Sequence, residues 1–429
     1  MSVERASSMK WHQAVVNFLG LKKSMFVLLA MVILVGLGEK MAERFLPLYL
    51  VALGGGAFSI GLLNGLDNLL SALYSYLGGY ASDQLGYKRA LILFNLIAML
   101  GYLVVIVFPY WPAVIIGAVF FLSWTAISLP ATMDMVARVL PKNKRTMGVS
   151  MHSLVRRIPM ALGPVLGGVM IGWFGVKAGV RLAFAAALIL GSVSLLLQQV
   201  LIENDKKRVG KTHGNPVRAL RLISPSLRNL LVSDILVRFC EQIPYAFVVI
   251  WCVKLNGISP LQFGILTTIE MATAMIIYIP VAYLADKSTK KPFVVATFGF
   301  FTLFPLVLLF SHSFWLMAVA FVIRGMKEFG EPTRKALIMD LAPEGKKAST
   351  FGVYYLLRDI VVSAAAFGGA FLWDASTAAK LFDALGIGHN LLPWIESVAS
   401  PTANFLTAFG FGIAGTLYFA LFGKDLKSG

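Results

Sequence analysis

The sequence predicts an all-α membrane protein, with twelve transmembrane helices in two pseudo-symmetric six-helix halves and both termini in the cytoplasm. Three observations lead to this fold class. Hydrophobic residues make up 58% of the 429 residues and charged residues only 14%, whereas a soluble domain carries about 25% charged residues. Twelve long apolar segments follow one another along the chain. A polar motif that follows the second segment recurs after the eighth.

Each apolar segment is long enough to cross a bilayer as a helix, which takes about 20 residues. Helices are expected because an isolated strand cannot satisfy its backbone hydrogen bonds in hydrocarbon, and barrel strands alternate over about ten residues. No cleavable signal is evident before the first segment. The predicted spans are 24–50, 58–82, 88–108, 112–136, 147–173, 179–202, 229–253, 261–285, 292–310, 315–338, 350–373 and 402–422.

Basic residues set the predicted orientation. Most of the 38 Lys and Arg residues fall in segments that are cytoplasmic if the N-terminus is inside, which is the usual bias of membrane proteins. The predicted outer loops hold only Lys177, Arg181, Lys254 and Lys380. The net charge of +17 therefore belongs to a cytoplasmic rim beside lipid and gives no indication of nucleic-acid binding. The predicted parts are a cytoplasmic tail (1–23), a first half (24–202), a basic linker (203–228), a second half (229–422) and a cytoplasmic tail (423–429).

An internal repeat supports the two halves. A shift of 203 positions places Asp67 on Glu270 and Asp83 on Asp286. From the fourth span onwards a shift of 202 fits better and places Arg156 on Arg358. Parallel six-helix halves are one known plan of secondary transporters.

The motif after the second span consists of Gly79, Asp83, Gly86, Lys88 and Arg89 in the spacing Gly-x-x-x-Asp-x-x-Gly-x-Lys-Arg. It resembles the loop signature of the major facilitator superfamily, although Tyr87 replaces a basic residue. The second copy keeps Asp286 and Lys291 but lacks the glycines. The resemblance implies a conformational hinge that latches the two halves through charge contacts, with Arg138 as the expected partner of Asp83.

A second motif lies in the fifth span, where Gly163, Pro164, Gly167 and Gly168 resemble the Gly-Pro-x-x-Gly-Gly signature of the exporter and drug–proton antiporter branches of that superfamily. Pro159 stands where that pattern has glycine. The arginine-centred fourth-span signature of many drug exporters is missing. The glycines also suit close helix packing, which would carry no information on transport direction.

Many charged residues fall inside the predicted spans, where a charge normally faces a cavity or a partner. The rise per residue of a helix places seven of them near the centres of their spans. In the resembling family the first, fourth, seventh and tenth helices line the central cavity. The predicted substrate and proton pathway consists of Glu39, Lys40, Asp67, Arg156, Glu241, Glu270, Arg324, Lys327, Glu328 and Arg358.

Structural ion pairing is the alternative interpretation of these charges. Residues four apart on one helix can form ion pairs, and Arg324 with Glu328 and Lys327 with Glu331 have this spacing. Asp67 and Glu270 are related by the repeat and are interpreted either as proton carriers or as gate residues.

We therefore expect a secondary active transporter that moves a small polar or charged organic molecule by alternating access, by proton-coupled export. Buried carboxylates can change their protonation enough to carry protons, so replacing Glu39 or Glu241 with Gln is predicted to uncouple transport. The alternatives are a proton-coupled importer of an organic anion or nutrient that uses Arg156, Arg324 and Arg358, and a membrane receptor or scaffold without transport.

No nucleophile, metal cluster or nucleotide-binding module is evident, so an enzyme is not expected and the proton gradient replaces a cofactor as the driving force. The expected partners are membrane lipid, protons and a small-molecule substrate. We expect a monomer that crosses the plasma membrane several times, or the inner membrane of a bacterium.

Overall fold

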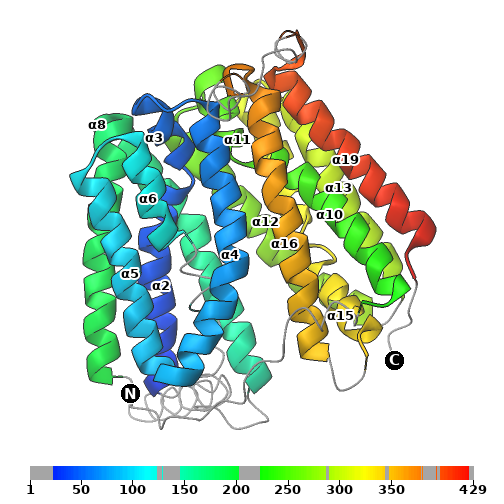
Figure 1. Cartoon of the computed structure of the whole chain (residues 1–429), viewed down its shortest axis with the longest axis horizontal. Helices are drawn as coiled ribbons and strands as arrows, with labels where there is room; N and C mark the ends of the chain where they lie inside the picture. The colour runs from blue at the N-terminus through cyan, green and yellow to red at the C-terminus, as the bar shows by residue number, and fades with distance from the viewer. Residues whose placement is uncertain are drawn as a thin grey trace, which may run out of the picture.

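The structure is a computed structural model of the whole chain, and it describes residues 23–122, 128, 145–201, 223–286, 289–343, 347–377, 379, 393 and 397–424. These residues form long helices joined by short turns. Figure 1 shows α2 to α8, coloured from blue to green, on one side of the molecule and α10 to α19, coloured from brighter green to red, on the other. We refer to these two sets of helices as the first and the second region.

The helices of the first region are α2 (Lys23–Glu43), α3 (Leu46–Ala52), α4 (Ala57–Leu85), α5 (Tyr87–Val107), α6 (Trp111–Phe121) and α8 (Arg145–Leu201). The last of these contains both the fifth and the sixth predicted span. Its backbone leaves the helical conformation at Gly175, where φ is 75° and ψ is 170°. Such a conformation favours glycine, so α8 consists of two helices joined at this residue.

The helices of the second region are α10 (Pro225–Tyr245), α11 (Val248–Ile250), the π-helical turn η3 (Trp251–Leu255), α12 (Pro260–Asp286), α13 (Lys291–Leu309), α14 (Phe314–Met326), α15 (Glu331–Leu341), α16 (Lys347–Trp373) and α19 (Pro401–Phe422). Two of them begin in the same way. The side chains of Ser224 and Ser400 cap α10 and α19, and a proline follows each serine. A capping hydroxyl satisfies a free backbone N–H, and proline suits the first helical position.

Three predicted spans are interrupted where the sequence suggested continuous helices. The first span breaks between α2 and α3, the seventh between α10 and α11, and the tenth between α14 and α15. A proline lies at each break: Pro47 in the first turn of α3, Pro244 at the end of α10 and Pro332 in the first turn of α15. Proline removes a backbone donor and crowds the preceding turn, which explains the interruptions.

The repeat recurs in backbone geometry. Gly54 and Gly257, which are 203 positions apart, both adopt a positive φ, of 85° and 68°, in the turns before α4 and α12. A Cβ added at Gly167 would lie 2.0 Å from the carbonyl oxygen of Met41, and one added at Gly369 would lie 2.1 Å from that of Ile243. Gly369 and Ile243 each lie 202 positions after Gly167 and Met41, so the repeat relates the two contacts.

The two regions meet along two helix pairs, α4 with α16 and α12 with α8. Glycine allows the close approach in each pair. A Cβ at Gly61 would lie 3.3 Å from the carbonyl oxygen of Ala366, and a Cβ at Gly264 would lie 2.5 Å from that of Pro164. These two contacts are also related by the repeat, so the interface has the same construction on both sides of the molecule.

The outer surface of α5 is apolar. Leu93, Leu96, Leu100, Leu103 and Val107 follow a helical spacing and are 40–58% exposed. Such a continuous apolar stripe would be unfavourable in water and suits contact with lipid. Seven helices of the described residues are long and apolar enough to cross a membrane. The count of twelve spans stays a prediction, because the interrupted spans are short or charged and part of the chain lies outside the description.

Candidate functional site

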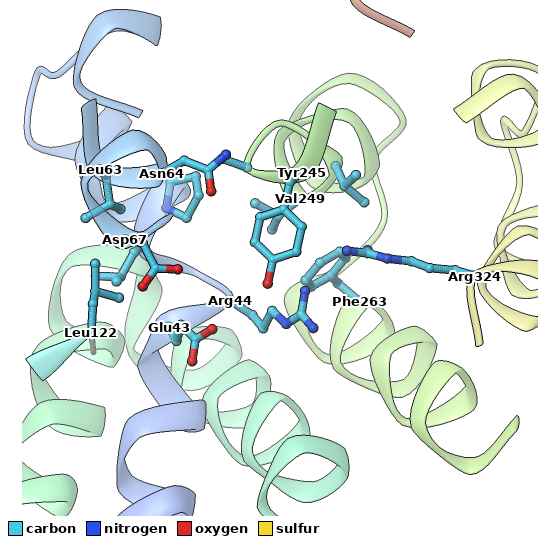
Figure 2. Close-up of a pocket in the computed structure, with 14 residues that line it drawn as sticks. Glu43, Arg44, Leu63, Asn64, Asp67, Leu122, Tyr245, Val249, Phe263 and Arg324 are labelled. Atoms are coloured by element: carbon cyan, nitrogen blue, oxygen red, sulfur yellow. The ribbon is translucent and has the colours of Figure 1, made fainter. Parts of the chain in front are cut away.

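A cavity with about 510 Å³ of empty space, including space open to solvent, lies between the two regions. Its walls come from α2 to α4 on one side and from α10 to α12 and α14 on the other (Figure 2). Apolar walls are supplied by residues such as Leu63, Leu122, Val249 and Phe263. The polar groups that line it are Glu43, Arg44, Asn64, Asp67, Tyr245 and Arg324.

Tyr245 lies between two arginines at the centre of this cavity. The guanidinium carbon of Arg44 is 5.3 Å from the centroid of the tyrosine ring, and that of Arg324 is 5.4 Å from it. Both distances are typical of cation–π contacts. Arg44 follows the last residue of α2 and Tyr245 ends α10, so two of the helix breaks place these side chains in the cavity.

The charged side chains of the cavity differ in how they are compensated. Glu43 forms an ion pair with Lys40, and Arg324 Nε lies 3.4 Å from Glu270 Oε1. Arg44 and Asp67, in contrast, make no ion pair with any residue that the structure describes. Figure 2 shows the carboxylate of Asp67 on the side of the cavity that faces Arg44 and Tyr245. The cavity therefore contains one cation and one carboxylate without an ion-pair partner among the described residues.

Charged residues of the second region form one connected set of ion pairs, which we call the second-region network. Lys327 joins two carboxylates, since its Nζ is 2.9 Å from Glu241 Oε1 and 3.3 Å from Glu270 Oε1. Arg238 Nη1 continues the chain to Glu241 Oε2 at 2.6 Å. The network consists of Asp234, Arg238, Glu241, Glu270, Arg324, Lys327, Glu331, Arg334, Lys335, Arg358 and Asp359.

Asp234 is the most connected carboxylate of this network, and its side chain is 1% exposed. It accepts hydrogen bonds from Arg334 Nη1 and from the hydroxyl of Tyr354, the latter at 3.1 Å. Arg358 Nη1 lies 3.5 Å and Arg238 Nε 3.9 Å from its oxygens. The network has five acidic and six basic members, and the sixth cation, Lys335, is 51% exposed and lies 3.4 Å from Glu331 Oε1. The formal charges of the other ten members cancel.

One ion pair joins the two regions directly. Arg157 Nη2, from α8, donates to Glu328 Oε2 at 3.0 Å in the segment between α14 and α15. Its neighbour Arg156 makes no ion pair within the described residues and does not line the cavity. The break in the tenth span therefore supplies a charge contact across the interface.

Comparison with known proteins identifies the family. The sequence profile of the Major Facilitator Superfamily matches residues 28–249 and 230–382, which together cover most of the chain. The chain belongs to the Major Facilitator Superfamily. Members of this superfamily are secondary transporters, so the protein is a multi-pass membrane transporter and not an enzyme.

An uncharacterized MFS-type transporter of Methanocaldococcus jannaschii is 25% identical over 382 residues, which are 83% of this chain and 90% of that protein. Among solved structures, a bacterial homolog of the human lysosomal transporter Spinster, inward-facing and unoccupied, has a TM-score of 0.68 at 14% identity, covering 94% of this chain and 99% of that one. The peptide transporter POT in complex with sulfate has a TM-score of 0.73 at 13% identity, covering 93% of each chain. At these identities the structures establish the fold alone.

The cavity and the network of this superfamily member bring together most of the residues proposed from sequence. Asp67 and Arg324 line the cavity, and Glu241, Glu270, Lys327 and Arg358 belong to the network. Glu39 and Lys40 lie one turn before the cavity on α2, with Lys40 Nζ 3.1 Å from Glu39 Oε1. Arg156 and Glu328 lie outside both groups.

Two of the predicted intrahelical pairs are wrong. Arg324 pairs with Glu270 rather than Glu328, and Lys327 pairs with Glu241 and Glu270 rather than Glu331. The reason is that α14 ends at Met326, so residues four apart no longer share one helical face. The pair between Asp234 and Arg238 does form within α10, at 3.9 Å.

Three contributors to the site were not singled out from sequence. They are Arg44, Tyr245 and Arg334, which are absent from the predicted substrate and proton pathway. The signal that would have identified the first two is the proline beside each: Pro47 lies three residues after Arg44, and Pro244 directly precedes Tyr245. Broken helices of transporters place binding groups at such points.

The hinge motif is described only in part. Gly79 lies within α4, and Gly86 precedes α5 with φ 82°, a conformation that favours glycine. Lys88 Nζ donates to the carbonyl oxygen of Gln199 at 3.0 Å, and Arg89 is exposed. Arg138 and the side chains of Asp83 and Asp286 lie outside the described residues, so the predicted latch stays a prediction.

The glycines of the fifth-span motif lie where α8 packs against α2 and α12. A Cβ at Gly163 would lie 2.6 Å from Lys40 Cβ, and one at Gly168 would lie 2.5 Å from the carbonyl oxygen of Pro260 in α12. The motif therefore allows α8 to approach α2 and α12 closely. Among the described residues, no group of three or more His, Cys, Asp or Glu side chains is arranged to hold a metal ion.

Proposed function

We propose that this protein is a proton-coupled secondary transporter of a small organic molecule that carries an anionic group. The observation that carries the proposal is Arg44, a cation in a cavity at membrane depth without an ion-pair partner among the described residues. A charge at such a depth is costly and normally faces a partner or a ligand. A guanidinium offers paired donors that match a carboxylate, phosphonate or sulfonate.

The second arginine of the cavity strengthens this assignment. Arg324 also approaches the Tyr245 ring but keeps Glu270 as a partner. An anionic group bound to Arg44 would lie in a site walled by Leu63, Val249 and Phe263, which suits an organic rather than an inorganic ion. A cationic substrate would meet the uncompensated charge of Arg44 and is disfavoured.

We further propose that two six-helix halves, twelve spans in total, rock about this cavity with both termini in the cytoplasm. The glycine contacts between the regions, related by the repeat, support such a motion because they place backbone against backbone with few interlocking side chains. The ion pair between Arg157 and Glu328 is then one of the contacts that opens and closes.

Two directions of transport have separate support. The Gly163-Pro164-x-x-Gly167-Gly168 motif resembles that of exporters, which favours proton-coupled antiport. The two arginines at the cavity favour an importer of an organic anion. Arg358 is not a substrate ligand in this proposal, because it pairs with Asp359 at 2.7 Å and contacts Asp234.

Counterflow in proteoliposomes tests the proposed function, since it needs no gradient and no knowledge of direction. Vesicles loaded with succinate, benzenesulfonate or phenylphosphonate should accumulate the same labelled anion, whereas the cationic dye ethidium should not exchange. Arg44→Gln should reduce anion counterflow by at least about tenfold, the loss of one charge-assisted hydrogen-bonded contact. Arg228→Gln, which changes an exposed arginine in the first turn of α10 outside the cavity, is the matched control and should exchange normally.

Exchange of ethidium without exchange of any anion would contradict the proposal and favour a cation exporter. Absence of flux for every probe, together with specific binding of an anion, would support the alternative of a receptor or scaffold.

A further inference from the structure

The charged groups next to the cavity in the first region do not balance. Three carboxylates, Glu39, Glu43 and Asp67, accompany two cations, Lys40 and Arg44. Lys40 contacts both Glu39 and Glu43 on the same helix. Asp67 comes from α4 and has no ion-pair or hydrogen-bond partner among the described residues. Asp67 is therefore the carboxylate of this group that has no cationic contact among the described residues.

The repeat provides a comparison inside the same molecule. Glu270 occupies the position on α12 that Asp67 occupies on α4. Its carboxylate is fully buried and lies 3.4 Å from Arg324 Nε and 3.3 Å from Lys327 Nζ. Two cations stabilise the ionised form of Glu270, so this residue holds Arg324 in place. Asp67, in contrast, is half-buried at the cavity and has no cation in contact with its carboxylate among the described residues.

We propose that Asp67 is the proton-binding site of the transport cycle, and that a proton on Asp67 and an anionic group on Arg44 bind cooperatively. This inference rests on the proposed function and adds to it the coupling residue and the sense of coupling. If the proton and the anion each strengthen the binding of the other, the protein carries both across the membrane together. The protein is then a symporter of protons and an organic anion.

The sign of the coupling follows from Coulomb's law. Asp67 and Arg44 line one cavity, and an ionised Asp67 repels an anion that approaches Arg44. Protonation converts the carboxylate to a neutral acid and removes this repulsion, so the anion binds more tightly. By linkage the bound anion favours protonation of Asp67 by the same factor. When the anion leaves, the proton is released to water from the same cavity.

Other charged groups near Asp67 do not reverse this sign. Within the described residues, α6 and α3 contribute no charged side chain, and those of α5 lie at its start. The carboxylates across the cavity already have cationic partners. The charged or titratable groups that face Asp67 or lie on the helices packed around it are Glu39, Lys40, Glu43 and Arg44 of the first span, Lys88 and Arg89 of α5, Arg156 and Arg157 of α8, Arg238, Glu241 and Tyr245 of α10, Arg324 of α14, and Arg358 and Asp359 of α16.

Proton exchange on binding is the direct test. The purified full chain in detergent is titrated with succinate, benzenesulfonate and phenylphosphonate by calorimetry, in two buffers that differ in ionisation enthalpy. Benzenesulfonate stays ionised over the whole pH range of the titration, so any proton exchanged when it binds belongs to the protein. We expect up to one proton taken up per anion bound, and an affinity that rises by up to about tenfold for each pH unit lowered in the titration range.

Asp67→Asn imitates the protonated form. It should bind the anion at all pH values with the affinity that the unchanged protein shows at low pH, without proton uptake. In proteoliposomes it should keep counterflow and lose accumulation driven by a pH gradient. Asp67→Ser provides a second neutral variant if the first folds poorly. Glu270→Gln is the comparison from the repeat: it removes the carboxylate that pairs with Arg324 and Lys327, and it should keep the proton uptake on anion binding.

Release of protons on anion binding would overturn the proposal and indicate antiport. Proton uptake that persists in both Asp67 variants would also overturn it and move the proton site to another carboxylate, Glu39 and Glu241 being the first to examine. If no anion binds and none exchanges in counterflow, the proposed function itself fails. Anion counterflow without proton uptake leaves the proposed function intact and overturns only the role of Asp67.

Discussion

The two regions of this transporter arrange charge at membrane depth in different ways. In the second region, eleven charged side chains form a connected network of ion pairs that reaches from the cavity through α10, α15 and α16. In the first region, a smaller group leaves Asp67 and Arg44 without ion-pair partners among the described residues. The backbone geometry of the two regions repeats, but their charge arrangement does not.

This difference separates structural from functional charge. An ion pair that is buried and fully hydrogen-bonded is costly to break and contributes little to binding, because neither partner is available to a ligand. A buried charge without such a partner is destabilising unless it is neutralised or liganded. We therefore assign the network mainly to the stability and geometry of the second region, and the first region to substrate and proton binding.

The largest expected effect comes from breaking the network at its centre. Asp234→Asn leaves Arg334, Arg358 and Arg238 facing one another without their shared carboxylate. Removing one partner of a buried ion pair costs about 3–5 kcal/mol. We expect a large fall in the midpoint of thermal unfolding of the purified protein in detergent, or loss of the folded protein on expression.

Asp359→Asn is the control for this variant, because Asp359 is more exposed and contacts Arg358, which keeps Asp234. It should lower the unfolding midpoint much less. Equal losses for the two variants would show that the network is not organised around Asp234.

A second experiment tests whether equivalent glycine contacts in the two regions contribute equally to stability. Gly167→Ala and Gly369→Ala each place a Cβ about 2 Å from a backbone oxygen, of Met41 and Ile243. Overpacking of this kind costs about 1–3 kcal/mol, and the two variants should lose similar stability. The measurement is the free energy of unfolding or, in its place, the unfolding midpoint.

Gly172 and Gly368 are the controls on α8 and α16, since nothing lies within 4 Å of a Cβ added there. Alanine at these positions should be neutral or stabilising by up to about 1 kcal/mol, because it favours helix over glycine. A large loss at Gly167 with none at Gly369 would break the structural equivalence of the two regions.

The smallest expected effect concerns the ion pair between the regions. Arg157 and Glu328 are both partly exposed, at 17% and 23%, and such pairs contribute about 0.2–1 kcal/mol. A double-mutant cycle with Arg157→Gln and Glu328→Gln should give a coupling energy in this range at low salt. A coupling energy of several kcal/mol would place this pair with the buried network rather than at an opening interface.

The membrane fold was predictable because it depends on composition and on a repeat that is present in the sequence. The superfamily was predicted from the resemblance of the motif after the second span to a known loop signature. The midplane charges were equally visible, since Asp67, Glu241, Glu270 and Arg324 interrupt apolar segments. Their partners were not. Pairing was inferred from spacing on continuous helices, and the break after Met326 removes that spacing for Arg324 and Lys327.

The breaks themselves explain what sequence reasoning missed. Pro47, Pro244 and Pro332 lie inside segments whose hydropathy predicts one helix each, and hydropathy does not respond to a single proline. Arg44 and Tyr245 reach the cavity only because the helices end beside them. The contrast between Asp67 and Glu270 also depends on which cations come from other helices, a long-range property that one helix cannot reveal.

The charge balance inside the second-region network has a consequence for the response to membrane voltage. Apart from the exposed Lys335, its five positive and five negative groups carry almost no net charge through the electric field when they move as one body. Moving one elementary charge across a potential of 100 mV is worth about 2.3 kcal/mol. The voltage dependence of the cycle then depends on the cargo and on Arg44 and Asp67 in the first region. In the proposed symport, a proton with a monovalent anion adds no net charge, whereas a second proton or a divalent anion would make the cycle generate or consume current.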